Sequence, residues 1–242
     1  MYIQLTFGDL VLTPTITNSV LIIASLTIFF IICGMTIKRA DPTRPSKGFM
    51  AFIEFIYSAI CDFAANSIGE QGHRFIPFVV TVASYLALAN MAGLLGLRPP
   101  TSDINITVAL AIITLTYIML SGIFSKGLWR YLKDTYIGDI RGLLLVLFIP
   151  ISIIGEFSKI VSLSFRLFGN VVSGALLISL LIGALVWGFT MWPVGGMLSS
   201  VFNIGLLPVV SAYFDIFAGL MQTFIFCTLT TMWIKSAVES EA

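Results

Sequence analysis

The sequence predicts an all-α integral membrane protein, on the evidence of its composition, its long uncharged segments and the placement of its basic residues. Hydrophobic residues make up 58% of the 242 positions and charged residues only 10%, whereas soluble globular domains carry about 25% charged residues. A helix needs about 20 apolar residues to cross a bilayer, and several uncharged segments reach that length. The net charge of +1 gives no reason to expect a nucleic-acid partner.

The first apolar segment covers residues 10–37, which contain no charged side chain. We expect its helix to begin near Ile16 and to end at Lys38 and Arg39, where two basic side chains meet the aqueous phase. The residues before it lack the positive region of a cleavable signal peptide, so we expect this helix to be retained in the membrane.

Residues 41–74 are more polar and predict a loop followed by an amphipathic helix. Apolar residues are interspersed here with Glu54, Asp62 and Glu70. An amphipathic helix of this kind lies in the plane of the membrane interface. We therefore predict an interfacial helix rather than a span.

Two further spans are expected at residues 75–97 and 104–125, because neither segment contains a charge. A proline-containing turn joins them, and Asp103 stands where a side-chain cap of the second helix is expected. Residues 126–141 combine basic and aromatic side chains, and we predict an interfacial loop there.

The C-terminal half predicts two unusually long helices. Residues 142–188 would extend about 70 Å as a helix, against a hydrocarbon thickness of about 30 Å. Because no loop-like cluster interrupts most of this segment, we favour one tilted or bent helix over two spans joined inside the membrane. A break at residues 192–196 precedes a second long helix, from about 197 to 237, with a kink expected near Gly205 or Pro208.

These segments predict a single membrane domain over residues 1–242, with five membrane-crossing segments and one interfacial helix. Residues 1–140 would form the N-terminal helices and interfacial segments, and residues 141–242 a long tilted helical hairpin. Basic residues gather in the loops at 38–50 and 126–141, and loops rich in Lys and Arg stay in the cytoplasm. The N-terminus is therefore expected outside and the C-terminus in the cytoplasm.

The strongly polar residues of the first long helix fall on one face. With about 3.6 residues per turn, one third of the helix circumference holds Glu156, Lys159, Arg166, Asn170 and Ser173. A charge at the bilayer centre costs about 2.5–3.5 kcal/mol. Such residues face a bundle interior or a water-filled cavity, and they mark ion pathways.

Arg166 has two interpretations. It could form a structural ion pair with Glu156 or Asp215, but Glu156 lies about 15 Å away along the same helix and can pair instead with Lys159, three residues later. It could also be a fixed cation in an ion path, because arginine keeps its proton at any physiological pH. Its counter-charge would then be Asp215 on another helix or a carboxylate of another subunit.

The last helix has a similar polar face, built from small residues together with Asp215 and Gln222. Asp215 can take up and release a proton and could line a water path, whereas the Gln222 amide can hydrogen-bond water without carrying charge. Three scattered cysteines and one histidine show no metal-ligand spacing. We therefore expect no metal site and no cofactor.

Two motifs resemble those of a known family. The segments SLSFRLFGN (162–170) and LMQTFIFCTLTTMWI (220–234) are similar to signature segments of subunit a of F-type ATP synthases. The stretch GHRFIPFVVTVASYLALANMAGLLG (72–96) resembles an earlier span of that family. The resemblance covers nearly the whole chain in the same order.

The resemblance implies a stator subunit of the Fo sector of a rotary ATP synthase, with no catalytic site of its own. Two aqueous half-channels would lead to the carboxylates of a rotating c-ring, and Arg166 would be the essential arginine that loads and unloads them, with Asn170 and Gln222 nearby. The flow of H⁺ or Na⁺ would thereby drive rotation and ATP synthesis. The implied partners are the c-ring, b-type peripheral stalk subunits, the lipid membrane and, indirectly, the F1 sector.

One position departs from the family pattern. Many members carry Glu or His five residues after the motif asparagine, where this chain has Ala175, while the second usual ionisable position is Asp215. Ser173 could substitute in part by binding water. Glu156 and Lys159 either line the same path or simply pair with each other, and the sequence leaves both alternatives open.

Two other classes fit the sequence less well. An independent secondary transporter would need its own substrate site, and the internal repeats common in that class are not evident. An intramembrane enzyme would need a nucleophile and base or a metal cluster, which one histidine and scattered cysteines do not supply. The Gly169-Asn170 pair is more similar to bacterial and plastid members than to animal mitochondrial ones, so we expect a bacterial inner membrane rather than a thylakoid or mitochondrial one.

Overall fold

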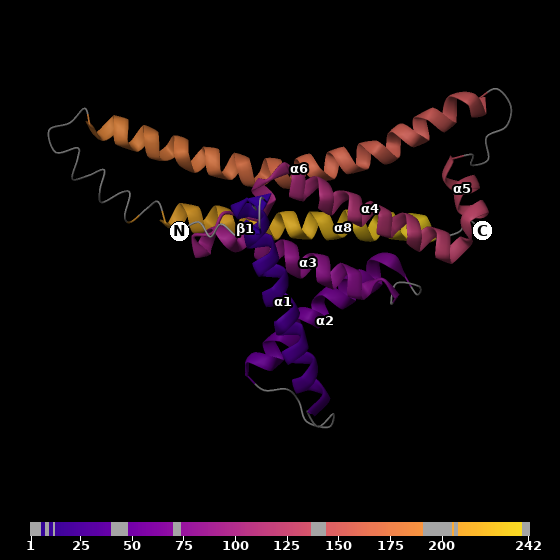
Figure 1. Cartoon of the computed structure of the whole chain (residues 1–242), viewed down its shortest axis with the longest axis horizontal. Helices are drawn as coiled ribbons and strands as arrows, with labels where there is room; N and C mark the ends of the chain where they lie inside the picture. Colours follow the sequence, from indigo (N-terminus) through magenta and orange to yellow (C-terminus); the bar gives the residue numbers. More distant parts are fainter. Residues whose placement is uncertain are drawn as a thin grey trace. The chain divides into compact units, whose positions relative to one another are not determined.

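The computed structural model is almost entirely helical (Figure 1), which confirms the predicted all-α membrane fold. Within the described residues, six helices are long and apolar enough to cross a membrane. A pair of two-residue antiparallel strands that the sequence did not predict, β1 (Thr6–Phe7) and β2 (Leu10–Val11), precedes them. The structure describes residues 6–7, 10–11, 13–39, 48–69, 74–136, 144–190, 205 and 208–238.

The residues group into two compact units that interleave along the sequence. Five of the long helices contribute residues to both units. The single membrane domain expected over the whole chain stays a prediction. The first unit combines Met1–Ile23, Tyr85–Thr107 and Phe165–Thr223, and the second combines Ala24–Ser84, Val108–Ser164 and Phe224–Ala242.

The first helix, α1 (Pro14–Arg39), begins slightly before the predicted start near Ile16 and ends at the predicted basic residues. Proline suits the first position of a helix, because its fixed φ and its missing N–H cost nothing there. Most of the loop that we predicted after this helix lies outside the described residues.

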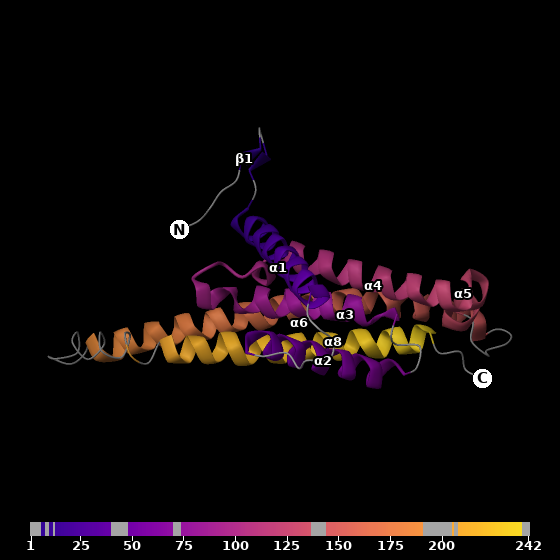
Figure 2. The same cartoon turned by 90° about the horizontal axis from the view of Figure 1, so that it is seen from below.

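The second helix, α2 (Phe49–Ile68), lies between two glycines with positive φ angles. In the second unit its Phe63 ring lies 5.4 Å from the ring of Phe224, measured between centroids. Figure 2 accordingly shows α2 beside α8 (Gly219–Val238). The helix is long and apolar enough to span a membrane, and its interfacial placement stays a prediction.

The next two predicted spans are both helical. The second span corresponds to α3 (Ile76–Met91) together with the 3-10 turn η2 (Ala92–Leu95), and the third span corresponds to α4 (Ile104–Lys126). The uncharged stretches in the sequence therefore located both segments to within a few residues.

The turn between these helices contains η3 (Pro100–Ser102) and the predicted helix cap. Asp103 Oδ1 accepts a hydrogen bond from the backbone N–H of Asn105 at 3.0 Å. Asp103 Oδ2 also accepts a bond from the hydroxyl of Thr15 at 2.9 Å. The capping role of Asp103 is therefore confirmed, and the same carboxylate ties α1 to the start of α4 within the first unit.

The loop predicted at residues 126–141 contains a helix, α5 (Leu128–Tyr136). The density of charge in this segment favoured a loop, but its apolar residues recur at helical spacing. As a result Tyr131 is buried while Trp129 is 84% exposed, which gives an amphipathic helix. The loop prediction is therefore wrong for these residues.

The long helix α6 (Leu144–Thr190) contains 47 residues and appears in Figure 1 as one uninterrupted ribbon. The prediction of a single helix over 142–188, in place of two spans, is confirmed. The helix continues through Pro150, although proline has no backbone N–H to donate. Its tilt in a membrane stays a prediction.

The last helical segment contains an unpredicted π-helical turn. The described part runs over Pro208–Val238, and within it the π-helical turn η4 (Phe214–Ala218) precedes α8. The predicted break at 192–196 and the start of this long helix lie outside the described residues, so the kink expected near Gly205 or Pro208 stays a prediction. Single π turns within helices are frequent at functional sites.

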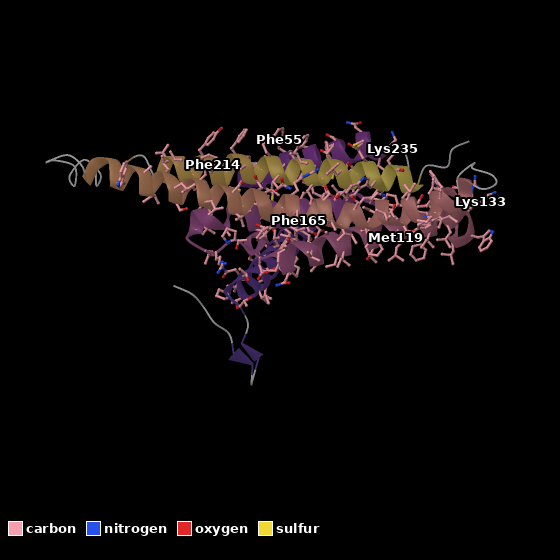
Figure 3. The ribbon with its side chains drawn as sticks, turned by 90° about the horizontal axis from the view of Figure 1, so that it is seen from above. Phe55, Met119, Lys133, Phe165, Phe214 and Lys235 are labelled. Atoms are coloured by element: carbon pink, nitrogen blue, oxygen red, sulfur yellow. The ribbon has the colours of Figure 1, made fainter. Side chains whose placement is uncertain are left out.

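The second unit has an apolar core between α2, α3, α4 and α8. Figure 3 shows Phe55 of α2 and Met119 of α4 on opposite sides of this unit. Phe55 is exposed, whereas Ala64 and Ile68 of the same helix are buried in the core. The buried core residues include Ala64, Ile68, Val79, Ala83, Ile118, Cys227 and Ile234.

Gly122 of α4 allows α5 to pack closely, because a Cβ atom at this position would overlap the ring of Tyr131. We expect Gly122→Ala to displace α5 and to lower the free energy of unfolding by about 1–3 kcal/mol. Thermal unfolding of the detergent-solubilised protein measures this loss. Gly155→Ala on α6 is the control, because nothing lies within 4 Å of a Cβ built there. An equal loss in both variants would contradict the packing argument.

Candidate functional site

Arg166 lies in the middle of α6 with an exposed side chain. Among the described residues it takes part in no salt bridge and no hydrogen bond. The ion pair with Asp215 that the sequence left open is therefore absent from the described part of the chain. A permanently charged side chain in an apolar helix remains without a counter-charge there.

Glu156 and Lys159 pair with each other, as their spacing predicted. Lys159 Nζ lies 2.6 Å from Glu156 Oε1, and it also lies 5.7 Å from the centre of the Trp233 ring, in a cation-π contact. Burial raises the pKa of the Tyr131 phenol on α5, and the negative charge of Glu156 raises it further. These residues all belong to the second unit.

The first unit contains a cleft of about 610 Å³. One wall is α6 from Asn170 to Ser179, and the rest comes from η4, the first residue of α8 and the segment that leads from α3 to α4. The polar side chains of the lining are Asn90, Arg98, Ser102, Asn170, Ser173, Ser179 and Asp215.

The cleft brings together three of the predicted site residues, Asn170, Ser173 and Asp215, and it also includes Ala175. Arg166 and Gln222 are not among its lining residues. Arg166 precedes Asn170 by one helical turn, which is about 6 Å along the axis. On the predicted polar face of α6, Asn170 and Ser173 therefore line the cleft, whereas Arg166 lies just beyond the end of the cleft.

Two asparagine amides hold the C-terminal end of η4. The Asn170 amide donates a hydrogen bond to the carbonyl oxygen of Ala218 at 3.2 Å, and the Asn90 amide donates to the carbonyl oxygen of Gly219 at 3.3 Å. Asn90 also accepts a bond from the Thr101 hydroxyl at 2.9 Å. A π turn interrupts the regular backbone ladder. The Asn170 amide supplies a partner for the last carbonyl of η4, and the Asn90 amide binds the first carbonyl of α8, which also accepts the Thr223 hydroxyl at 2.9 Å.

Asp215 lies half-buried in η4, with its carboxyl group against Gly93 of η2. Arg98 lines the same cleft, and its Nε donates a hydrogen bond to the Ser102 hydroxyl at 3.4 Å. The described lining of the cleft thus contains one acidic and one basic side chain.

Gln222 is only 5% exposed, and its amide nitrogen has no hydrogen-bond partner among the described residues. A buried donor without a partner costs about 1–3 kcal/mol. Gln222 therefore offers a donor to water or to a group from outside the chain.

The cleft residues that were missed from the sequence include Asn90, Gly93 and Arg98. Asn90 was visible as a polar amide inside an uncharged span, which is a signal for a buried hydrogen bond. Arg98 follows the span predicted at residues 75–97, and its position indicated only the start of a turn. Gly93 gave no sequence signal, because its role depends on contact with a residue far along the chain.

Comparison with known proteins decides the family. The family model described as ATP synthase A chain matches residues 18–235. The chain belongs to this family. This result confirms the resemblance to subunit a of F-type ATP synthases.

Several relatives of the ATP synthase A chain family are similar over most of the chain. ATP synthase subunit a of Mycoplasma pneumoniae is 31% identical over 224 residues, which are 89% of this chain and 76% of that protein. The subunit of Syntrophobacter fumaroxidans is 30% identical over 235 residues, covering 96% and 87% respectively. The subunit of Helicobacter pylori strain P12 is 30% identical over 228 residues, covering 93% and 91%.

Membership of the ATP synthase A chain family makes this an integral membrane subunit of the ion-translocating Fo sector, which is not the catalytic part of the complex. The described residues contain no group of three or more His, Cys, Asp or Glu side chains that could hold a metal ion.

Asn90 joins two segments of this ATP synthase subunit, so its removal should destabilise the first unit. We expect Asn90→Ala to lower the free energy of unfolding by about 1–3 kcal/mol, because the buried Thr101 hydroxyl loses its partner. The Gly219 carbonyl loses one of two side-chain donors and keeps the Thr223 hydroxyl at 2.9 Å. Asn105→Ala is the control, because that amide is exposed and bonds only locally in the described contacts. Thermal unfolding that is equally early in both variants would contradict this prediction.

Proposed function

We propose that this subunit carries the ions that drive a rotary ATP synthase, with Arg166 facing the rotor and the cleft of the first unit serving as an aqueous half-channel. One observation carries the proposal: Arg166 is exposed, has no ion pair among the described residues and lies one helical turn from a polar cleft. The family assignment supplies the context, since the relatives are subunits of ATP synthases.

Arg166 needs a counter-charge from outside the described chain. A charge at the bilayer centre costs several kcal/mol unless it is paired or hydrated. A carboxylate on a c-ring subunit would provide that charge, and an adjacent arginine favours the ionised form of a carboxylic acid. Each arriving carboxylate would therefore release its H⁺ or Na⁺ near Arg166 and bind an ion again after moving on.

The cleft has the size of a water path, and polar side chains form part of its mostly apolar lining. Its volume of about 610 Å³ corresponds to roughly 20 waters at about 30 Å³ each. The carboxylate of Asp215 can accept and release a proton. Asn170 and Ser173 can form hydrogen bonds with water in the cleft. Asp215 is therefore the ionisable residue that we assign to this half-channel, with Ser173 in a water-binding role.

Arg166 would also separate the two half-channels. It lies beyond the end of the cleft on α6 rather than in its lining, and a fixed positive charge repels a cation that moves farther along the helix. Ions would then have to transfer to the c-ring instead of leaking past it. Gln222, whose amide nitrogen has no partner among the described residues, would bind a buried water.

Of the two roles left open for Glu156 and Lys159, the structure favours the simple pair. The contact of 2.6 Å and the adjacent Trp233 ring already satisfy the Lys159 charge. We therefore assign them no step in ion transfer. The partners in this proposal are the c-ring, the b-type stalk subunits and, through the stalk, the F1 sector.

Replacement of Arg166 tests the central assignment. In a complex reconstituted into liposomes, Arg166→Ala should reduce ATP-driven uptake of H⁺ or Na⁺ to background, because no fixed cation remains to ionise the c-ring carboxylate. A proton-sensitive dye and labelled Na⁺ report the two ions. Arg130→Ala on α5 is the control for loss of an exposed arginine. Coupled uptake that survives in Arg166→Ala would refute the assignment.

Replacement of Asp215 tests the half-channel. Asp215→Asn keeps the size of the side chain but removes its titration, so ion uptake should slow without loss of coupling. A barrier higher by about 1.4 kcal/mol would slow the rate tenfold, and we expect a loss of about that size. The measurement is the initial rate of uptake over a range of pH. An unchanged rate and pH profile would remove Asp215 from the path.

A further inference from the structure

We propose that Gly93 is a positioning residue for ion transfer. The cleft has space for one carboxyl group, and an aspartate at either residue 215 or residue 93 could place its carboxyl group there. The missing side chain of Gly93 lets the Asp215 carboxyl group occupy this position. The inference rests on the proposed role of Asp215 in the half-channel and adds to it a residue that the sequence did not single out.

The evidence is the close approach of Gly93 to the whole carboxyl group of Asp215. A Cβ atom built on Gly93 would lie 2.7 Å from Oδ2, 3.1 Å from Cγ and 3.3 Å from Oδ1 of Asp215. Carbon and oxygen atoms in ordinary contact are separated by about 3.5 Å or more. Any side chain at residue 93 would therefore have to move the carboxyl group.

This contact is specific among the glycines described in the first unit. A Cβ atom built on Gly169, Gly174 or Gly183 of α6 would meet nothing within 4 Å. Gly219 is the other described glycine of this unit with a close neighbour, at 3.0 Å from the Cβ atom of Asn90. The close approaches thus occur where η2 and the end of α3 meet η4 and the start of α8.

The two backbones are held in this position by contacts outside the carboxylate itself. The Asn90 amide binds the carbonyl oxygen of Gly219 and the Thr101 hydroxyl binds Asn90. Asn90 precedes Gly93 by one turn, and Gly219 follows Asp215 by four residues. The distance between residues 93 and 215 therefore does not depend on the identity of the side chain at either position.

The same geometry predicts that the carboxylate can be supplied from the opposite side. Asp215→Ala removes the carboxyl atoms Cγ, Oδ1 and Oδ2. The space that these atoms occupied lies about 3 Å from a Cβ atom at residue 93. An aspartate introduced by Gly93→Asp would place its carboxyl group in that space. The cleft would keep one acidic side chain, still in the company of Arg98.

A set of four variants tests the inference in the complete ATP synthase complex, reconstituted into liposomes. They are Gly93→Ala, Asp215→Ala, the double variant Gly93→Asp with Asp215→Ala, and the double variant Gly93→Ala with Asp215→Ala. Gly183→Ala is the control for adding a methyl group to a glycine of the same unit. Rates of ATP-driven H⁺ and Na⁺ uptake are normalised to the amount of assembled complex and measured as a function of pH.

The expected pattern follows from a shared site. Gly93→Ala should slow uptake about tenfold and shift its pH profile, and it should add nothing to the loss caused by Asp215→Ala, since contacting residues are not additive. Gly93→Asp with Asp215→Ala should restore most of the wild-type rate. Gly183→Ala should match the wild type.

Three results would overturn this inference without affecting the proposed half-channel. One is a slow Asp215→Ala variant that Gly93→Asp does not restore, and another is a pair of losses from Gly93→Ala and Asp215→Ala that multiply. A Gly93→Ala variant that works at the wild-type rate would overturn it as well. If Gly93→Ala prevents assembly, the restoring double variant decides the question. A wild-type rate for Asp215→Ala would instead remove Asp215 from the path, and with it the proposed half-channel.

Discussion

The arrangement of this chain depends on the cost of leaving a polar or charged group without a partner among apolar helices. Lys159 is neutralised by Glu156, Asn170 binds the carbonyl of Ala218, and Asn90 binds two groups at once. Arg166 differs from these, because the described chain supplies it with no partner. Within the described residues Arg166 is therefore a charge without a counter-charge, as the proposed role opposite a c-ring carboxylate requires.

The π-helical turn η4 decides which polar residues share a surface. On a regular helical wheel Asp215 and Gln222 fall on one face, but a π turn takes up an extra residue and rotates the helix beyond it. Asp215 lines the cleft in the structure, whereas Gln222 is buried away from it. The two asparagines bind the Ala218 and Gly219 carbonyls, one turn after Asp215.

Features that depend on local pattern were predictable, and those that depend on distant contacts were not. Uncharged stretches located α1, α3 and α4, because a membrane helix must be long and apolar. A long apolar segment without a loop-like break located α6. The helix α5 was missed because its charges outweighed a short apolar repeat. The polar face of α6 predicted Asn170 and Ser173 in the cleft, but Gly93 could not be found, because its importance comes from a carboxyl group on another helix.

The course of α6 through Pro150 has a mechanical consequence. In the function that we propose, a rotor acting on Arg166 would load the helix sideways, and the ladder of backbone hydrogen bonds would carry that load. Proline removes one bond from such a ladder, and helices bend most sharply at proline. Pro150 lies more than four turns before Arg166. The missing hydrogen bond would therefore add bending freedom to α6 at a distance from the charge.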